Sequence, residues 1–227
     1  MLAAIALTPC APVLVPELAG EAAAEVADFS SAARAAAATL PQRWIAIGVG
    51  PAESVIEPDT RSTFAGYGVD LPVALSEQAD LPITAVPLCA LVAGWLRGQA
   101  NPRAEVQVRV YPAGLGAGAA QTFGSRLRAE IDAIADPIGV LVVADGFHTL
   151  TASAPGGHQP ESEPVQTGLD DALATGDAAA LTHLPDGIVG RVAYQVLAGL
   201  APHPTAAVQL ARGAPYGVGY FVGTWSP

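Results

Sequence analysis

The chain has 227 residues, a length that suits one large domain or two small ones and that can bury a sizeable core without disulfide staples. Half of the residues are apolar, yet no uninterrupted apolar run reaches the ~20 residues of a membrane span. The formal net charge is -11 and every basic residue is Arg, because the chain contains no Lys. This acidic, lysine-free composition argues against nucleic acid or an anionic membrane as a partner, and it excludes Schiff-base lysine chemistry.

The first predicted elements are a strand, a helix and a strand. Residues 1–9 form a short apolar run that stops at a proline, as a buried strand does. Residues 17–40 are rich in Ala, with acids early and Arg34 late, which favours a helix. The run "RWIAIGVG" predicts a second buried strand. This order indicates an α/β domain.

The later elements continue the alternation after a loop-like segment over residues 51–82. The stretches "TAVPLCALVAGWLRGQ" and "GAAQTFGSRLRAEIDAI" predict helices, and "AEVQVRVYP" and "PIGVLVVADG" predict strands. Two helical stretches over residues 165–184 and 186–200 lead to two closing strands joined around Gly213 to Pro215. We predict one three-layer α/β domain over residues 1–227, with a mixed, largely parallel central sheet flanked by helices.

The small number of cysteines bears on where in the cell the protein is found. Cys10 and Cys89 are too few for a disulfide framework, and no basic residues precede the first apolar run. We expect a cytoplasmic protein in which both cysteines are small, buried apolar residues.

Three loops that leave strands carry side chains suited to chemistry. Open α/β sheets bind ligands outside the carboxyl ends of their strands. The first loop holds Cys10, the second holds Glu53 and Glu57, and the third holds Asp145 and His148. If the three strands are neighbours in the sheet, we expect these groups to converge on one pocket.

His148 is the sharpest signal among these residues, because it follows Asp145 by three positions at the end of the predicted central strand. An imidazole titrates near neutral pH and can move a proton there. The alternative is that His148 only hydrogen-bonds the loop to the sheet edge. The spacing alone leaves both interpretations open.

Several motifs, taken in chain order, resemble the class III extradiol ring-cleavage dioxygenases, such as the catalytic subunit of protocatechuate 4,5-dioxygenase. They are "TPCAPVLVPE", "FAGYG", "ADGFHTLTASAPGGHQPE", "ALATGDAAAL" and "YGVGYFVGTW", and they extend over most of the chain. The resemblance implies the family's Fe(II) site, in which two His and one carboxylate leave room for a catechol and O2. It also implies that His148 is the acid–base catalyst and that Asp145 supports its loop.

The ligand positions that the resemblance implies are substituted in this chain. Cys10 stands where the first His belongs, and "GVGPAESV" lacks the second. The late helix, where the family carboxylate belongs, offers Gly190 and Arg191 instead. We therefore expect no cofactor. If any divalent metal binds through Cys10, Glu53 or Glu57, and His148, thiolate and imidazole ligation favours Zn over Fe(II).

We therefore predict a dioxygenase-like protein with a degenerate metal site and a pocket around His148 for a small aromatic molecule or a partner. The first alternative is an active extradiol dioxygenase that cleaves a catechol through an atypical site. The second is a non-enzymatic interaction protein, since some relatives lack oxygenase activity. We also predict a homo-oligomer in which the apolar tail "YGVGYFVGTW" forms an edge strand that pairs across the interface.

Overall fold

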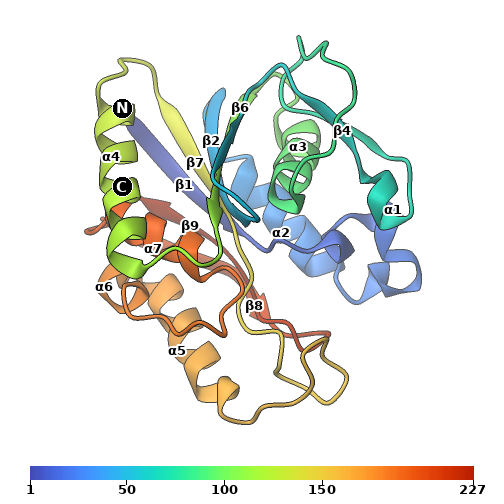
Figure 1. Ribbon diagram of the computed structural model, residues 1–227, viewed down its shortest axis with the longest axis vertical. Helices are drawn as coiled ribbons and strands as arrows, with labels where there is room; N and C mark the ends of the chain where they lie inside the picture. The colour runs from blue at the N-terminus through green and yellow to red at the C-terminus, as the bar shows by residue number, and fades with distance from the viewer.

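The computed structural model describes residues 1–227 and shows a central sheet with helices on both faces (Figure 1). The sheet has seven strands in the order β3-β6-β2-β7-β1-β9-β8. Its strands are β1 (Leu2–Thr8), β2 (Arg43–Gly50), β3 (Ser54–Ile56), β6 (Glu105–Pro112), β7 (Ile138–Val143), β8 (Ala206–Gly213) and β9 (Tyr220–Ser226).

The four strands in the middle of this order, β6, β2, β7 and β1, run parallel to one another. The strands β3, β9 and β8 are antiparallel to their neighbours. The predicted α/β domain with a mixed, largely parallel sheet is therefore confirmed. A separate two-stranded sheet joins β4 (Arg61–Thr63) to β5 (Pro72–Ala74) within the segment predicted as a loop.

The helices form the outer two layers. Figure 1 shows α2 and α3 on one face of the sheet, and α4, α5, α6 and α7 on the other. Their bounds are α1 (Pro16–Ala19), α2 (Ala27–Ala37), α3 (Leu88–Ala100), α4 (Ala117–Asp132), α5 (Ser162–Thr175), α6 (Ala178–Leu181) and α7 (Arg191–Leu200). Short 3-10 turns cover Pro12–Leu14, Gly20–Ala24 and Phe64–Tyr67. No helix combines the length and the apolar character needed to cross a bilayer.

The buried core divides between the two faces because side chains alternate along each strand. On β2, Ile45 and Ile47 join a cluster of 31 buried residues on the α4–α7 face. Trp44 and Ala46 point the other way, into a cluster of 24 buried residues on the α2–α3 face. The continuous apolar runs of the sequence therefore correspond to strands that are covered on both sides.

Two expectations differ from the structure. The helix predicted over residues 17–40 is broken, because Gly20 adopts a φ of 54°, a left-handed conformation that interrupts a helix. The tail motif forms β9, which lies inside the sheet between β1 and β8, so β8 and not β9 is the edge strand. Assembly of two copies stays a prediction.

Candidate functional site at the carboxyl ends of β1 and β7

The loops after β1 and β7 bring two of the predicted residues into contact. The two strands are parallel neighbours whose register ends at Thr8 and Val143, and the Ala144 N–H donates to the Thr8 carbonyl at 2.9 Å. Immediately beyond, the Cys10 backbone N–H donates to Asp145 Oδ1 at 2.8 Å. The predicted convergence therefore holds for the first and third loops.

The Asp145 carboxyl group is buried with few partners. The residue is 8% exposed, and the Cys10 N–H is its side chain's only hydrogen-bond donor. Its second oxygen has no partner, yet it is not sealed from solvent, since only Thr8 Oγ1 and Ser30 Oγ are buried without a hydrogen bond. Burial raises the pKa of Asp145 to about 7, against a smaller lowering by the Cys10 N–H. Both protonation states are therefore populated at neutral pH.

The backbone around Asp145 is fixed by contacts from two other segments. The Gly190 N–H, just before α7, donates to the Asp145 carbonyl at 2.8 Å. The Gly146 N–H donates to the Gly219 carbonyl at 2.8 Å. Gly190 also has no room for a side chain, because a Cβ there would lie 2.7 Å from the Asp145 carbonyl oxygen. These contacts fix the position of the backbone that carries the carboxyl group.

Two free thiols, those of Cys10 and Cys89, lie on the α2–α3 face of the sheet, and Cys10 is the one next to this carboxyl group. Cys10 is partly exposed, and its pKa is raised by burial first and then by Asp145 and Cys89. Cys89, on α3, is fully buried, and burial raises its pKa to about 11. It packs closely on β2, because a Cβ at Gly48 would lie 2.6 Å from its sulfur. Both groups are therefore thiols at neutral pH, and neither is a ready nucleophile or metal ligand.

Tyr67 also belongs to this neighbourhood, although sequence reasoning did not select it. Its pKa is raised by burial and then by Cys10 and Cys89, so its hydroxyl lies within Coulombic reach of both thiols. The residue is 46% exposed, and its ring packs edge-on against that of Phe64, with the ring centroids 6.1 Å apart. The motif "FAGYG" contained this residue, but nothing in the sequence singled out its phenol.

The other predicted residues lie apart from this pair. Glu53 and Glu57 are exposed at the β3–β6 edge, where Gln107 Nε2 donates to Glu57 Oε2 at 2.9 Å. His148 is exposed, and its ring lies against the backbone of the following loop, since a Cβ at Gly156 would meet it at 2.8 Å. Its imidazole makes no hydrogen bond to the protein. The acid–base role of His148 stays a prediction.

The residues present do not fit the family's Fe(II) site. No three His, Cys, Asp or Glu side chains are grouped so that they could share an ion. Where the resemblance places the carboxylate, Gly190 touches the Asp145 backbone, and Arg191 points its guanidinium at Asp186, 3.2 Å away. Arg191 also donates to Gln195 and to the Ala113 carbonyl, each at 3.1 Å. The start of α7 is thus occupied by the Arg191 guanidinium, which already has an ion-pair partner and two hydrogen-bond acceptors.

The comparisons with known proteins find a solved structure that has a similar fold. No protein-family model and no curated protein matches the chain. A crystal structure of an uncharacterized protein from Escherichia coli K12 is similar, with a TM-score of 0.58 and 12% sequence identity. The match covers 99% of this chain and 100% of that one. At this identity the likeness shows that the two chains share a fold over their whole lengths.

Proposed function

We propose that the chain is a class III extradiol dioxygenase-like protein with a degenerate metal site, which binds a small aromatic molecule beside Asp145 and does not cleave rings with Fe(II). The observation that carries this proposal is the buried carboxyl group of Asp145, which has one oxygen held by the Cys10 N–H and the other free. Because this oxygen has no partner in the protein and is not sealed from solvent, a ligand with a hydrogen-bond donor can pair with it.

The surroundings favour a phenol or catechol as this ligand. Tyr67, which is 46% exposed and held by the buried Phe64 ring, offers an aromatic surface on the side of the two thiols, where a flat ring can pack. A phenolic hydroxyl can donate to the free oxygen of Asp145 when that group is ionised. Because the pKa of Asp145 is about 7, the same group can accept or return a proton near neutral pH.

Two further observations agree with this proposal. The Arg191 cation and the contact of Gly190 with Asp145 take the place where the resemblance puts the metal-binding carboxylate. Cys10 and Cys89 are both unpaired, which suits the reducing cytoplasm, and we place the protein there.

The test is a calorimetric titration of the metal-free protein with catechol at pH 6 and pH 8. We expect binding without metal that tightens at pH 8, where ionised Asp145 accepts a hydrogen bond from the catechol. In Asp145→Asn the affinity should fall about tenfold at pH 8, the effect of one charge-assisted hydrogen bond, and should no longer depend on pH. The matched control is Asp136→Asn, which removes an exposed carboxylate at the other end of the sheet.

Two results would overturn the proposal. One is Fe(II)-dependent consumption of O2 with ring opening of catechol, which would make the chain an active dioxygenase. The other is a pH dependence of catechol binding that survives in Asp145→Asn and disappears in His148→Ala, which would assign the titrating group to His148.

A further inference from the structure

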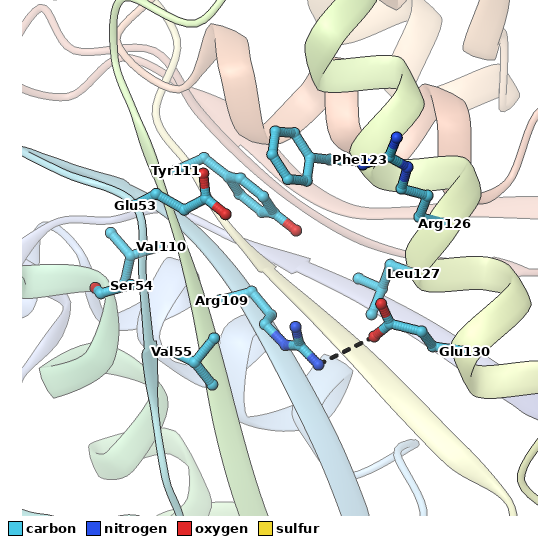
Figure 2. Close-up of a pocket in the computed structure, with 10 residues that line it drawn as sticks. All are labelled: Glu53, Ser54, Val55, Arg109, Val110, Tyr111, Phe123, Arg126, Leu127 and Glu130. Atoms are coloured by element: carbon cyan, nitrogen blue, oxygen red, sulfur yellow. Dashed lines mark hydrogen bonds and ion pairs between the residues drawn. The ribbon is translucent and has the colours of Figure 1, made fainter.

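A pocket lies between the β3–β6 edge of the sheet and α4, with a volume of about 220 Å³ (Figure 2). None of the residues of the Asp145 site lines it. Its walls come from β3, from the end of β6 and from one face of α4, and the residues that matter most are Glu53, Val55, Arg109, Tyr111, Phe123 and Leu127. The proposed function above makes no use of this pocket.

Tyr111 gives the pocket an unsatisfied polar group. The residue is only 5% exposed, and its hydroxyl has no hydrogen-bond partner in the protein although it is not sealed from solvent. Figure 2 shows this hydroxyl pointing across the pocket toward the Leu127 side chain. Burial raises the pKa of Tyr111 to about 12, so the phenol stays protonated at physiological pH. Its oxygen is therefore free to accept a hydrogen bond from a ligand.

The charges around the pocket leave one carboxylate free beside this phenol. Arg109 is already engaged, because it donates to Gln107 Oε1 at 2.9 Å and to Glu130 Oε2 at 3.1 Å. Glu53 makes no ion pair, and it is close enough to Tyr111 to contribute to the raised pKa of the phenol. With a net charge of -11, the whole chain also attracts cations over long range.

The remaining walls are apolar and partly aromatic. The rings of Tyr111 and Phe123 are 5.2 Å apart between centroids and are tilted by 54°, and Val55 and Leu127 extend this surface. The volume lies below the roughly 300–1,000 Å³ of sites for drug-sized ligands. The pocket therefore suits a ligand of about one ring with a short chain.

We propose that this pocket binds a small arylalkylamine, with the ammonium group between the Glu53 carboxylate and the Tyr111 hydroxyl and the ring against Phe123 and Leu127. The ammonium donates to both oxygens, which gives the Tyr111 oxygen a hydrogen-bond donor and pairs Glu53, while the Tyr111 O–H still donates to water. The ring buries apolar surface that is now in contact with water.

The presence of Arg126 raises the question of whether the ligand is a cation or an anion. It is exposed on α4 at the same pocket and forms no ion pair. A ligand with a carboxylate would use Arg126 in place of Glu53. The amine is favoured because the net charge of -11 attracts a cation to the protein and repels an anion.

The experiment is a titration with phenethylamine at low salt, with 3-phenylpropionate as the anion of similar size and shape. We expect the amine to bind with a higher affinity than the anion, and its affinity to fall as salt is added. Glu53→Gln should weaken amine binding about fivefold, as expected for loss of a partly exposed ion pair. Tyr111→Phe should weaken it about threefold to tenfold, as expected for loss of one hydrogen bond.

Glu57→Gln is the matched control, because it removes a carboxylate from the same sheet edge that is engaged by Gln107 and does not line this pocket. Its affinity for phenethylamine should equal that of the wild type. Thermal unfolding of each variant checks that the fold is kept. Absence of amine binding, tighter binding of 3-phenylpropionate, or equal losses in Glu53→Gln and Glu57→Gln would each overturn the proposal.

Discussion

Arg97 and Asp145 are both buried charged residues, but they lie at opposite ends of the sheet and have different surroundings. Arg97, on α3 near the start of β6, is 7% exposed. Its guanidinium donates to the carbonyls of Ala104 at 2.7 Å, Ala74 at 3.3 Å and Pro102. Asp145, at the carboxyl end, is 8% exposed and accepts one hydrogen bond.

The difference separates a structural charge from a candidate functional one. Arg97 gives its donors to backbone carbonyls of three segments, so it fastens α3, β5 and the turn before β6 to one another. Asp145 keeps an oxygen free at the end of the sheet where α/β folds bind ligands. Burial by itself does not distinguish the two groups, whereas the number of their partners does.

The largest expected effect is that of Arg97→Met, which keeps the apolar stem and removes the guanidinium. Three carbonyls lose their donor, and we expect the free energy of unfolding to fall by about 3–5 kcal/mol. Urea denaturation measures this change. The control is Arg103→Met, which alters an exposed side chain and should change stability by less than about 0.5 kcal/mol. Equal stability of the two variants would contradict a fastening role for Arg97.

The next effect concerns the pH dependence of stability. Because burial raises the pKa of Asp145 from 3.8 to about 7, the folded state keeps a proton that the unfolded state releases above about pH 4. The free energy of unfolding should therefore fall as the pH rises from about 4 to 7. In Asp145→Asn this part of the slope should vanish, leaving the variant more stable than the wild type at pH 8 by about 2–4 kcal/mol.

The measurement for this second prediction is urea denaturation of both proteins between pH 4 and pH 8. The pKa of Asp170 is also raised by burial, to about 6, so some slope should remain in the variant. The informative quantity is therefore the difference between the two curves. Curves that stay parallel over this range would mean that Asp145 is not a buried titrating group.

The smallest effect is on the reactivity of Cys10. The residue is partly exposed, but the pKa of its thiol is raised by burial and by the Asp145 charge, so alkylation by iodoacetamide at pH 8 should be slow. Asp145→Asn removes that charge and should speed the reaction about twofold to fivefold. Mass spectrometry of the Cys10 peptide gives the rate, and the buried Cys89 serves as the internal reference. An unchanged rate would mean that the charge of Asp145 does not affect the pKa of the Cys10 thiol.

The sequence was sufficient to predict the layers of the fold, because its strong patterns belong to segments buried on both sides. The runs "RWIAIGVG" and "PIGVLVVADG" became β2 and β7 with nearly the expected bounds. The short strands β3, β4 and β5 were not predicted. Each has three residues, and most of their positions are not buried, so their hydrophobic pattern is weak.

The candidate site was predictable only in part, for a related reason. Strand ends can be located from the sequence, and this led to Cys10 and Asp145. The sequence pattern does not predict the directions in which loop side chains point. His148 follows Asp145 closely in sequence but lies exposed, whereas Tyr67 lies in another loop and is influenced by both thiols. Glu53 and Glu57 follow β2, but the antiparallel turn into β3 carries them toward the sheet edge.

The position of β9 bears on how the chain can fold during its synthesis. In the finished sheet β1 lies between β7 and β9, and Ile5 is paired with Trp225, so almost the whole chain separates these partners. Until β9 leaves the ribosome, one edge of β1 has no neighbour, and the Leu173 carbonyl lacks the Trp225 indole that donates to it at 2.7 Å. Such distant pairing slows folding. A nascent chain of this protein therefore exposes an apolar strand edge until β9 has left the ribosome.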